Sequence, residues 1–289
     1  MSNQSFPNKT TLKQSSNLIT PIVLTIAGSD SGGGAGIQAD IKAISATGSY
    51  ACSAITAITS QNTLGVSAIF PIPLAHIESQ LDAIFSDINI SAVKIGMLAD
   101  SDIIKIVADK LRQYQPKFVV LDPVMIATSG DLLLQENAIN TLKRELFPLV
   151  NIITPNLPEA AALTGLPVPQ NETDMLSMVS ALRALNTNTV LLKGGHLSDQ
   201  MDSLDLLITE HSVKRFSAPR INTQNTHGTG CTLSSAIASY LAKGNSLYDA
   251  VSKAKSYISQ AILQADQLNI GKGHGPVNHF FVMSHCEAS

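Results

Sequence analysis

The fold is decided by the stretch Asn225-Thr-His-Gly-Thr-Gly-Cys-Thr-Leu-Ser-Ser-Ala-Ile-Ala-Ser-Tyr-Leu-Ala-Lys-Gly244, which predicts a glycine-rich loop that runs into a helix. Gly228 and Gly230 let the backbone turn tightly and leave no Cβ in the way of a ligand. Small and apolar residues then continue to Leu241, and Gly244 is a helix stop signal. The unpaired N–H groups at the start of such a helix, together with its dipole, favour an anion. A loop of this kind can also be a plain connection, so an anion site needs support from the rest of the chain.

A second glycine-rich turn lies near the other end of the chain, at Gly28-Ser-Asp-Ser-Gly-Gly-Gly-Ala-Gly36, and it supports the same interpretation. The apolar run at 22–27 before it predicts a buried strand. The residues after it predict a helix with Ile37, Ile41 and Ile44 on one face.

Apolar runs and segments of helical spacing alternate along the remaining sequence. Further strands are expected at 51–59, 66–70, 92–96, 118–122, 150–154 and 189–195, with a late hairpin at 204–209 and 212–216. Further helices are expected at 74–88, 101–113, 135–147, 172–185, 230–242 and 246–265, and a short one is capped by Asn156. Repeated strand–helix units predict an α/β fold of three α/β/α layers, with a central, mostly parallel sheet and helices on both faces.

The composition agrees with a core that is buried on both faces of a sheet. Of 289 residues, 44% are hydrophobic and 14% are charged, and no shift in composition indicates a linker. We therefore expect a single domain over residues 21–283. Residues 1–20 are rich in Ser, Thr, Asn and Gln and lack an apolar segment, which predicts a disordered polar tail rather than a secretory signal.

Charge and cysteine usage exclude several classes of function. The net charge is −3 and no cluster of Lys and Arg occurs, so no nucleic-acid partner is expected. No apolar run approaches the roughly 20 residues that span a bilayer, so no membrane partner is expected. Cys52, Cys231 and Cys286 lie far apart, without metal-ligand spacing, which fits a reduced and cytoplasmic protein.

Polar and flexible residues gather where the predicted strands end. In a parallel sheet, ligands bind beyond the carboxyl ends of the strands. The segments expected at that edge are Gly28–Gly36, Gly96-Met97, Asp122-Pro123, Asn156–Glu159, Lys193–Gly195 and Gly228–Cys231. One edge of the sheet is therefore expected to carry the chemistry.

Two common nucleotide motifs do not account for these loops. Gly34-Ala-Gly-Ile-Gln-Ala39 fits a loose dinucleotide pattern, but residues 50–70 contain no Asp or Glu to hold a ribose. Neither glycine loop has the Gly-Lys-Ser/Thr ending of a P-loop. A nucleotide that binds here is held in another way.

Three charged residues at successive strand ends could serve a phosphate. Asp122 and Glu159 could hold a hydrated Mg²⁺, which prefers few carboxylates together with waters and substrate phosphates. Lys193 precedes a Gly-Gly pair, and its ammonium could reach a phosphate as a point charge. Each residue alone also has an ordinary structural explanation, as a turn cap, a first-turn helix acid or a solvated strand end.

Cys231 is expected in the first turn of the helix after Gly230, where a helix N-terminus lowers the pKa of a thiol. It could be a nucleophile, but no His and Asn at useful spacing complete a thiol hydrolase. The alternatives are a buried small residue and a polar contact to a reacting group.

Eight segments match one known family in order and without a large gap, over about residues 20–281. They are Thr25-Ile-Ala-Gly-Ser-Asp-Ser-Gly-Gly-Gly-Ala-Gly-Ile-Gln-Ala-Asp40, Thr59-Ser-Gln-Asn-Thr63, Val93-Lys-Ile-Gly-Met-Leu98, Val120-Leu-Asp-Pro-Val-Met125, Ile153-Thr-Pro-Asn-Leu-Pro-Glu-Ala160, Leu192-Lys-Gly-Gly-His196, Asn225–Ser235 and Gly273-His-Gly-Pro-Val-Asn-His-Phe280. These segments resemble hydroxymethylpyrimidine/phosphomethylpyrimidine kinase, the thiamine-pathway kinase of the ribokinase-like fold.

The resemblance implies two ATP-dependent steps at one site. The first phosphorylates 4-amino-5-hydroxymethyl-2-methylpyrimidine, and the second converts that monophosphate to the diphosphate used to build thiamine. By position, the resemblance implies that Asp40 and Gln61 hydrogen-bond the amino group and ring nitrogen of the pyrimidine. It also implies that Gly28, Met97 and Val124 line the pyrimidine pocket.

The resemblance further implies a phosphate side of the same site. Asp122 and Glu159 match the Mg²⁺ ligands, with Asn156 beside them. Lys193, Thr226 and Thr229 match contacts to the ATP phosphates. Gly228, Gly230 and Cys231 match the anion hole over the transferring phosphoryl group, which depends on positioning and charge neutralisation.

The resemblance leaves two questions open. Sugar kinases of this superfamily have an Asp as base where this chain has Cys231, so the base is a thiolate, a water or absent. The same fold also serves pyridoxal kinases, and Cys231 could form an adduct with an aldehyde, so a pyridoxal or dual-specificity kinase is the alternative. A member that only binds pyrimidine or ATP as a sensor is another alternative. Gln61 favours the pyrimidine kinase, and a homodimer, usual in the resembling family, is expected.

Overall fold

A computed structural model describes residues 20–125, 136–195, 197 and 202–283. Within these residues, nine strands form a single sheet in the order β3-β2-β1-β4-β5-β6-β7-β8-β9. The strands are β1 (Ile22–Asp30), β2 (Tyr50–Asn62), β3 (Gly65–Pro71), β4 (Ala92–Ile95), β5 (Val119–Leu121), β6 (Ile152–Ile153), β7 (Thr189–Lys193), β8 (Asp202–Thr209) and β9 (Val213–Pro219). The six neighbouring strands β2, β1, β4, β5, β6 and β7 are parallel to one another. The outer strands β3, β8 and β9 pair antiparallel with their neighbours. The predicted parallel sheet and its late hairpin are confirmed.

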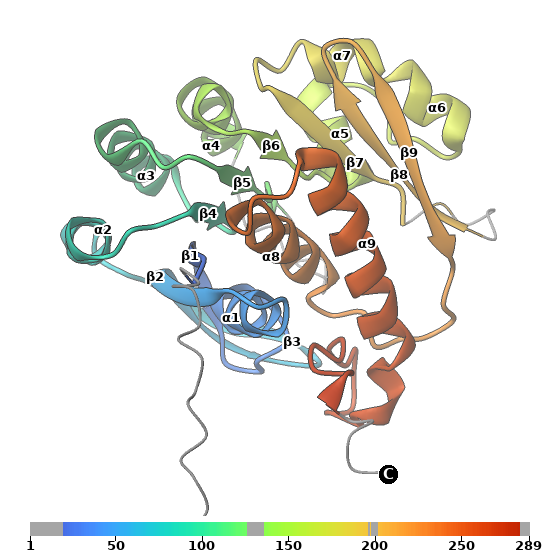
Figure 1. Ribbon diagram of the computed structural model, residues 1–289, viewed down its shortest axis with the longest axis horizontal. Coiled ribbons are helices and arrows are strands. Elements are labelled where there is room, and N and C mark those ends of the chain that lie inside the picture. The colour runs from blue at the N-terminus through green and yellow to red at the C-terminus, as the bar shows by residue number, and fades with distance from the viewer. Residues whose placement is uncertain (1–19, 126–135, 196, 198–201, 284–289) are drawn as a thin grey trace, which may run out of the picture.

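Helices cover both faces of the sheet (Figure 1). One layer contains α1 (Gly36–Ala46), α8 (Thr229–Ala242) and α9 (Leu247–Leu263). The other contains α2 (Leu74–Asp87), α3 (Ser101–Tyr114), α4 (Glu136–Thr141), a π-helical turn (Leu142–Leu146), a 3₁₀ turn (Phe147–Leu149), α5 (Leu157–Thr164), α6 (Glu172–Ser177) and α7 (Val179–Arg183). A last 3₁₀ turn, Ala265–Gln267, follows α9. No helix in the described ranges is long and apolar enough to cross a membrane.

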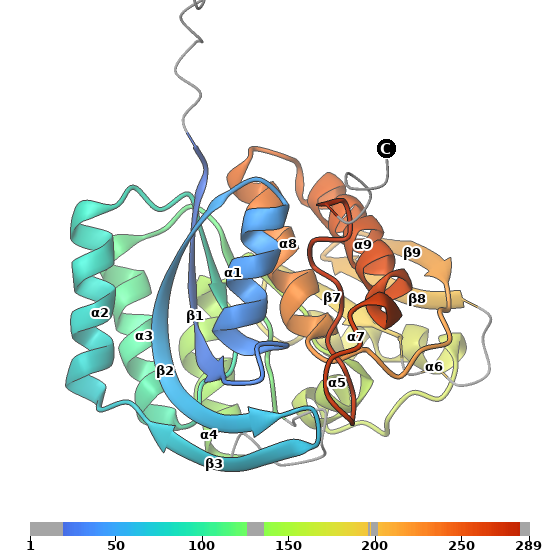
Figure 2. The same ribbon diagram turned by 90° about the horizontal axis from the view of Figure 1, so that it is seen from below.

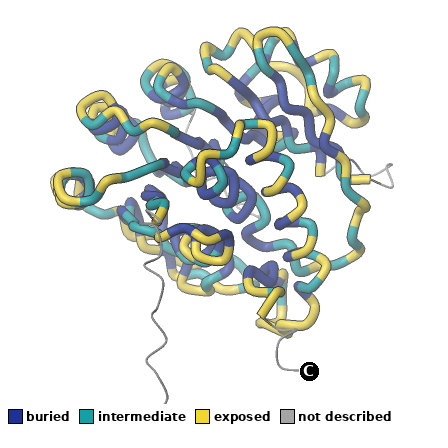
Figure 3. Tube along the Cα trace, viewed as in Figure 1, coloured by how far each residue is buried: buried dark blue, intermediate teal, exposed yellow. Residues whose placement is uncertain are grey.

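Alternate residues of the parallel strands point into the two layers, which explains their near-continuous apolar sequences. Leu24 and Ile26 of β1 pack in the core under α2 to α7, whereas Val23 packs in the core under α1, α8 and α9. The central strands and the inward helix faces are buried, and the outer helix faces are exposed (Figure 3). The sheet is therefore a rigid platform, and its carboxyl edge can hold side chains in fixed positions.

The first helix differs from the prediction in the face that it buries. Ile37 and Ile44 are buried, but Ile41 is 37% exposed. The buried face of α1 instead contains Ala39, Ala43 and the charged residue Asp40, because α1 packs closely against α8 as well as against the sheet. A hydrophobic pattern taken from one helix does not include this second partner.

The hairpin of β2 and β3 curves away from the rest of the sheet (Figure 2). The strand β2 is longer than predicted and runs on to Asn62, and most residues of β3 are exposed. The C-terminal segment lies against the hairpin end, where the N–H of His274 donates to the carbonyl of Thr63 at 3.0 Å. A Cβ at Gly273 would lie 2.2 Å from that carbonyl oxygen, so glycine permits the close approach. The hairpin end is thus fixed next to the carboxyl edge of the sheet.

Candidate active site

A cavity of about 1050 Å³ lies along the carboxyl edge of the sheet. The predicted site residues that line it are Gly28, Gln61, Met97, Asp122, Val124, Asn156, Glu159, Lys193, Thr226, Gly228, Thr229, Gly230 and Cys231. Asp40 is the one predicted site residue that does not line it. Thirteen positions spread over more than 200 residues of sequence thus meet in one cavity, which makes it the candidate active site.

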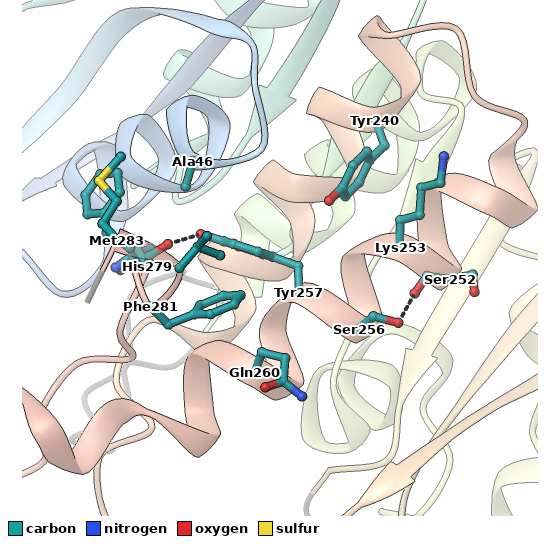
Figure 4. Close-up of a pocket in the computed structure, with 12 residues that line it drawn as sticks. Ala46, Tyr240, Ser252, Lys253, Ser256, Tyr257, Gln260, His279, Phe281 and Met283 are labelled. Carbon is teal, nitrogen blue, oxygen red and sulfur yellow. Dashed lines mark hydrogen bonds between the residues drawn. The ribbon is translucent and has the colours of Figure 1, made fainter. Parts of the chain in front are cut away.

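A smaller hollow of about 450 Å³ lies elsewhere, between α8, α9 and the C-terminal segment (Figure 4). Its wall includes the rings of Tyr240, Tyr257 and Phe281, and the Tyr257 hydroxyl donates to the carbonyl of His279 at 2.8 Å. None of the predicted site residues lines this hollow. It is therefore not the candidate active site.

The phosphate side of the large cavity centres on an ion pair between two strand ends. Asp122 follows β5 and Lys193 ends β7, and the lysine Nζ is 2.8 Å from Oδ1 of the aspartate. Thr154 also donates to Oδ1, at 2.9 Å. Burial opposes ionisation of Asp122, but the positive charges of Lys193 and Lys94 outweigh it and lower its pKa. The carboxylate is therefore ionised at neutral pH, and its Oδ2 has no protein donor among the described residues.

Glu159 stands beside this pair in the first turn of α5. Its carboxylate accepts the N–H of Asn156 at 2.8 Å, while the Asn156 side chain accepts the N–H of Glu159 at 2.9 Å, which forms a capping box. Burial, together with the nearby charge of Asp122, raises the pKa of Glu159 to about 7 against the influence of Lys193. Glu159 thus caps the helix, as its structural interpretation predicted, and it also lines the cavity.

Two carboxylates at this position fit Mg²⁺. The described residues contain no cluster of three or more His, Cys, Asp or Glu that would make a closed metal site. Mg²⁺ does not need one, because it keeps several waters and binds one or two carboxylates together with substrate phosphates. Asp122 and Glu159 supply such a set of ligands.

The start of α8 closes over the ion pair. A Cβ built on Gly230 would lie 3.2 Å from Oδ2 of Asp122 and 3.3 Å from Nζ of Lys193. Gly228 has a φ of +80°, and a Cβ there would lie 1.7 Å from the carbonyl oxygen of Gly34. The two glycine-rich loops are therefore in backbone contact, and the N–H groups at the start of a 14-residue helix lie next to an acid and a lysine.

The structure corrects the predicted pKa shift of the Cys231 thiol. Burial raises the pKa of its thiol to about 11, although the positive charge of Lys94 and an N–H from Gly36 act in the opposite direction. The sequence predicted a lowered pKa from the helix start alone, but the loss of hydration outweighs that effect. The thiol of the empty site is therefore protonated at neutral pH.

Asp40 differs from its predicted position at the pyrimidine. It is completely buried on α1, and both of its oxygens are 2.8 Å from Nζ of Lys94 on β4. Thr25 and Ser235 also donate to it, at 2.6 and 2.8 Å. A carboxylate occupied in this way has no free direction toward a ligand, so Asp40 holds Lys94 in place instead.

Lys94 borders the cavity, and sequence reasoning missed it because a lysine inside a short apolar strand gives no signal of its own. Gly96 is the one nearby residue that indicates an inward-facing lysine. A Cβ at Gly96 would lie 2.7 Å from Nζ of Lys94, so glycine leaves room for the ammonium.

Asp30 and His227 were also missed as site residues. The first glycine loop folds around the Asp30 carboxylate, which accepts the N–H groups of Gly32, Gly34 and Ala35 at 2.8, 3.0 and 2.8 Å. His227 Nε2 lies 2.9 Å from Oδ2 of Asp30 across the cavity wall. These contacts join the two glycine loops, and the aspartate inside a run of Ser and Gly was the available sequence signal.

A second ion pair also lines the cavity. Lys255 of α9 donates to Asp205 of β8 at 2.7 Å, and the N–H of Gly194 donates to the same carboxylate at 3.0 Å. Ile258 and Ile262 of α9 form an apolar wall beside it. An apolar wall next to polar groups suits a flat heterocycle.

An acid–lysine pair under a glycine-rich helix start, at the carboxyl edge of an α/β/α sheet, is the arrangement expected of a small-molecule kinase of the ribokinase-like class. A family model described as phosphomethylpyrimidine kinase matches residues 30–278. The chain belongs to this family.

Individual relatives and solved structures support this family assignment. The chain is 52% identical over 257 residues to a hydroxymethylpyrimidine/phosphomethylpyrimidine kinase of Salmonella typhimurium, covering 89% of this chain and 96% of that protein. It is similar to the crystal structure of phosphomethylpyrimidine kinase from Clostridium difficile (TM-score 0.74, 46% identity, 83% and 99% of the two chains). It is also similar to a pyridoxal kinase of Staphylococcus aureus in complex with AMP-PCP and pyridoxal (TM-score 0.82, 32% identity, 90% and 94%).

Proposed function

We propose that the protein is an ATP- and Mg²⁺-dependent kinase that phosphorylates 4-amino-5-hydroxymethyl-2-methylpyrimidine and then the resulting monophosphate, for thiamine biosynthesis. The observation that carries the proposal is the placement of two different ends in one cavity. The Asp122–Lys193 pair and the start of α8 form the phosphate end, and Gln61 and Met97 lie at the other. Membership of the phosphomethylpyrimidine kinase family supports the substrate.

At the phosphate end, the protein supplies charge and position. Lys193 neutralises the transferring phosphoryl group, and the N–H groups between Gly228 and Cys231 point at its oxygens. Thr226 and Thr229 flank the same loop and contact the nucleotide phosphates. Mg²⁺, held by Asp122 and Glu159 with Asn156 beside them, would bridge and neutralise phosphate oxygens when bound.

At the pyrimidine end, Gln61 hydrogen-bonds the heterocycle, and Gly28, Met97 and Val124 line its faces. A Cβ at Gly28 would lie 2.7 Å from the terminal methyl carbon of Met97, so this glycine leaves room for the methionine side chain at the pocket wall. The substrate hydroxymethyl group lies near Cys231, between the two ends. Because its thiol is protonated, Cys231 contacts the reacting group without removing its proton, and a loose transition state needs little help from a base.

The direct test is ATP consumption by the purified protein with Mg²⁺, offered the hydroxymethylpyrimidine, its monophosphate and pyridoxal in parallel. We expect turnover of both pyrimidines, and loss of both activities in Asp122→Asn. Turnover of pyridoxal alone would overturn the substrate and leave the phosphate end intact. Clear binding of pyrimidine without turnover would instead support a sensor.

A pyridoxal or dual-specificity kinase is the second candidate. A TM-score of 0.82 to a pyridoxal kinase complex favours it, and Cys231 lines the cavity, where its sulfur could form an adduct with an aldehyde. The pyridoxal arm of the same assay decides between the candidates, because a dual enzyme consumes ATP with all three compounds.

We further propose that the protein works in the cytoplasm as a homodimer. Support comes from the resembling family and from the β2–β3 hairpin, on which Ile58, Ile69 and Phe70 are 49%, 46% and 63% exposed. Light scattering of the full chain tests the dimer, and a mass of one chain at micromolar concentration would contradict it.

A further inference from the structure

A glycine-rich segment near the C-terminus, Gly-Lys-Gly-His-Gly-Pro-Val at residues 271–277, has no part in the proposed function. Glycine occupies every second position at its start. An added Cβ at Gly273 would lie 2.2 Å from the carbonyl oxygen of Thr63. One at Gly275 would lie 2.2 Å from Oδ1 of Asn225. Glycine therefore lets this segment, the glycine strap, pass in close contact with two separate elements.

The strap holds the end of the β2–β3 hairpin, residues 60–66, through consecutive backbone donors. The N–H groups of Lys272 and Gly273 both donate to Oγ1 of Thr63, at 3.2 Å. The N–H of His274 donates to the carbonyl of the same threonine at 3.0 Å. Gln61 lines the cavity from a part of β2 that has run past β1 and pairs with β3 alone. The strap therefore supports the hairpin end that carries the proposed pyrimidine contact.

The same strap holds the loop that enters α8, residues 225–231, which is named the α8 loop. The N–H of Gly275, the next donor along the strap, reaches Oδ1 of Asn225 at 2.9 Å. His227 pairs with the strap in both directions. Its N–H donates to the Gly275 carbonyl at 3.0 Å, and its carbonyl accepts the N–H of Val277 at 3.3 Å. Adjacent strap residues thus hold two different parts of the cavity wall.

The side chain of Asn225 is held in one orientation. Its Nδ2 donates to Oδ1 of Asp266 at 2.7 Å. Hydrogen bonds from Thr223 and Asn225 lower the pKa of that carboxyl group. An ionised carboxylate can only accept, so the amide nitrogen faces Asp266 and the amide oxygen faces Gly275. The hydrogen bond from the strap to the α8 loop therefore has a fixed acceptor.

We propose that the glycine strap fixes the hairpin end relative to the α8 loop and thereby sets the distance between the acceptor hydroxyl and the nucleotide phosphates. This inference rests on the proposed function, which places the pyrimidine at the hairpin end and the phosphates at the α8 loop. Neither Thr63 nor Asn225 lines the cavity. Both are thus positioning residues that act through the two elements.

Phosphoryl transfer depends on how the two substrates are placed. The attacking and leaving oxygens must lie roughly in line, and a misplacement of about 1 Å lowers the rate about 10²-fold. When one attachment of the strap is lost, each substrate keeps the contacts to its own end of the cavity. We therefore expect kcat to fall while the affinity of each substrate is retained. Both attachments act through one strap, so loss of the second should add little to loss of the first.

The experiment compares kcat with the dissociation constants of the hydroxymethylpyrimidine and of AMP-PCP, both measured by calorimetry. Thr63→Val removes the Oγ1 acceptor at nearly constant shape, and Thr63→Ser keeps it. Asn225→Leu removes Oδ1 at similar size. Lys272→Ala changes an exposed side chain of the strap and keeps its backbone N–H, so it is the control.

Thr63→Val and Asn225→Leu should each lower kcat about tenfold and change both dissociation constants less than about threefold. The double variant should stay within about threefold of the slower single variant, whereas independent effects would multiply to about 100-fold. Thr63→Ser and Lys272→Ala should resemble the wild type. Multiplied effects in the double variant, or an equal loss in Thr63→Ser and Thr63→Val, would overturn the proposal.

Hydrogen exchange of the ligand-free protein tests the same link without activity. Thr63→Val should speed exchange of backbone amides in the α8 loop, and Asn225→Leu should speed it in the hairpin end. Ser31→Ala is the matched control. It removes a different hairpin contact, the 2.8 Å hydrogen bond from the Gln61 N–H, and should leave exchange in the α8 loop unchanged.

Faster exchange that stays confined to the element carrying the substitution would overturn the coupling while the kinase stands. If the wild type turns over neither pyrimidine, the proposed function fails. The exchange data still decide in that case whether the strap couples the two elements.

Discussion

Lys193 and Asp122 meet at 2.8 Å with side chains only 15% and 3% exposed. Neither charge is stable in such a place without the other, because an unpaired ion loses its hydration. The pair therefore keeps the ammonium group in place in the empty protein, so that a nucleotide bound as proposed would meet a prepared site.

Changing Lys193 to alanine should reduce turnover far more than pyrimidine binding. We expect kcat to fall on the order of 10²- to 10³-fold, since one electrostatic contact to the transition state is lost. Calorimetry should show that the dissociation constant of the pyrimidine changes less than about threefold, because Gln61 and Met97 are untouched. Lys105→Ala, at an exposed lysine, is the control. A loss of pyrimidine affinity with full turnover at saturating substrate would contradict the assignment of Lys193 to the phosphate end.

Cys231→Ser should keep kcat within about tenfold of the wild type, because general-base catalysis, which is worth about 10²- to 10⁴-fold, is not lost. Burial raises the pKa of the thiol to about 11, so the wild-type thiol is protonated at neutral pH. The measurement is kcat between pH 6 and pH 9 for both proteins. A loss of several hundredfold, with a wild-type rate that climbs with pH, would revive the thiolate.

Among the elements, the start of α8 depends most on backbone shape. The N-cap, Gly228, has left-handed φ and lies against the Gly34 carbonyl. Gly244, after the same helix, has a φ of +83°, but an added Cβ there would meet nothing within 4 Å. The two glycines thus share a conformation and differ in their surroundings.

Gly244→Ala should cost about 1 kcal/mol of unfolding free energy, the strain of a left-handed residue with a Cβ. Gly228→Ala should cost at least about 3 kcal/mol, since a backbone carbonyl must also move. Urea unfolding of both variants checks the difference. Equal losses would mean that the contact between the loops contributes nothing to stability.

The sequence predicts helices and strands better than it predicts which helices and side chains come into contact. The stretches at 101–113 and 230–242 were placed within one or two residues, because helical spacing and capping signals are local. Ile41 was misplaced because a second helix packs on α1. Lys94 and His227 were missed because each is defined by an acid far away in sequence, Asp40 or Asp30.

For the molecule as a whole, burial makes stability depend on pH through His279. Its exposure is 5%, and burial, followed by the charge of Lys42, lowers the pKa of this histidine to about 4. The unfolded histidine, with a pKa near 6.5, binds a proton more readily, so stability is full above pH 6.5 and is lost as pH falls toward 4.

Because of His279, the free energy of unfolding should therefore fall by about 2 kcal/mol when the pH is lowered from 7 to 5. Glu159 acts in the opposite sense over the same range, because burial raises its pKa to about 7. The histidine contribution is isolated by comparing urea midpoints of the wild type and His279→Gln at both pH values. The variant should lose less stability on acidification, and identical losses would contradict the argument.

The global architecture followed from the alternation of strands and helices, and the carboxyl edge followed from the parallel sheet. That is why the strand-end residues Asp122, Glu159 and Lys193 could be placed at one edge before its geometry was known, whereas Gln61, Val124 and Thr226 were assigned from the family resemblance. Protonation states could not be assigned, because burial depends on the packed molecule. Cys231 shows this, since its helix-start position predicts a pKa shift of the wrong sign.

The contact between Gly34 and Gly228 also bears on how the protein is made. The first loop leaves the ribosome early and the second near the end of the chain, 194 positions later (228 − 34). At 5–20 residues per second, roughly 10 to 40 s of synthesis separate them. During that interval the sheet face that α8 and α9 later cover is uncovered, and neither the phosphate end nor the Asp30–His227 pair exists. A prematurely ended chain that stops before residue 225 should consequently be inactive and expose the apolar sheet face that α8 and α9 cover in the full chain.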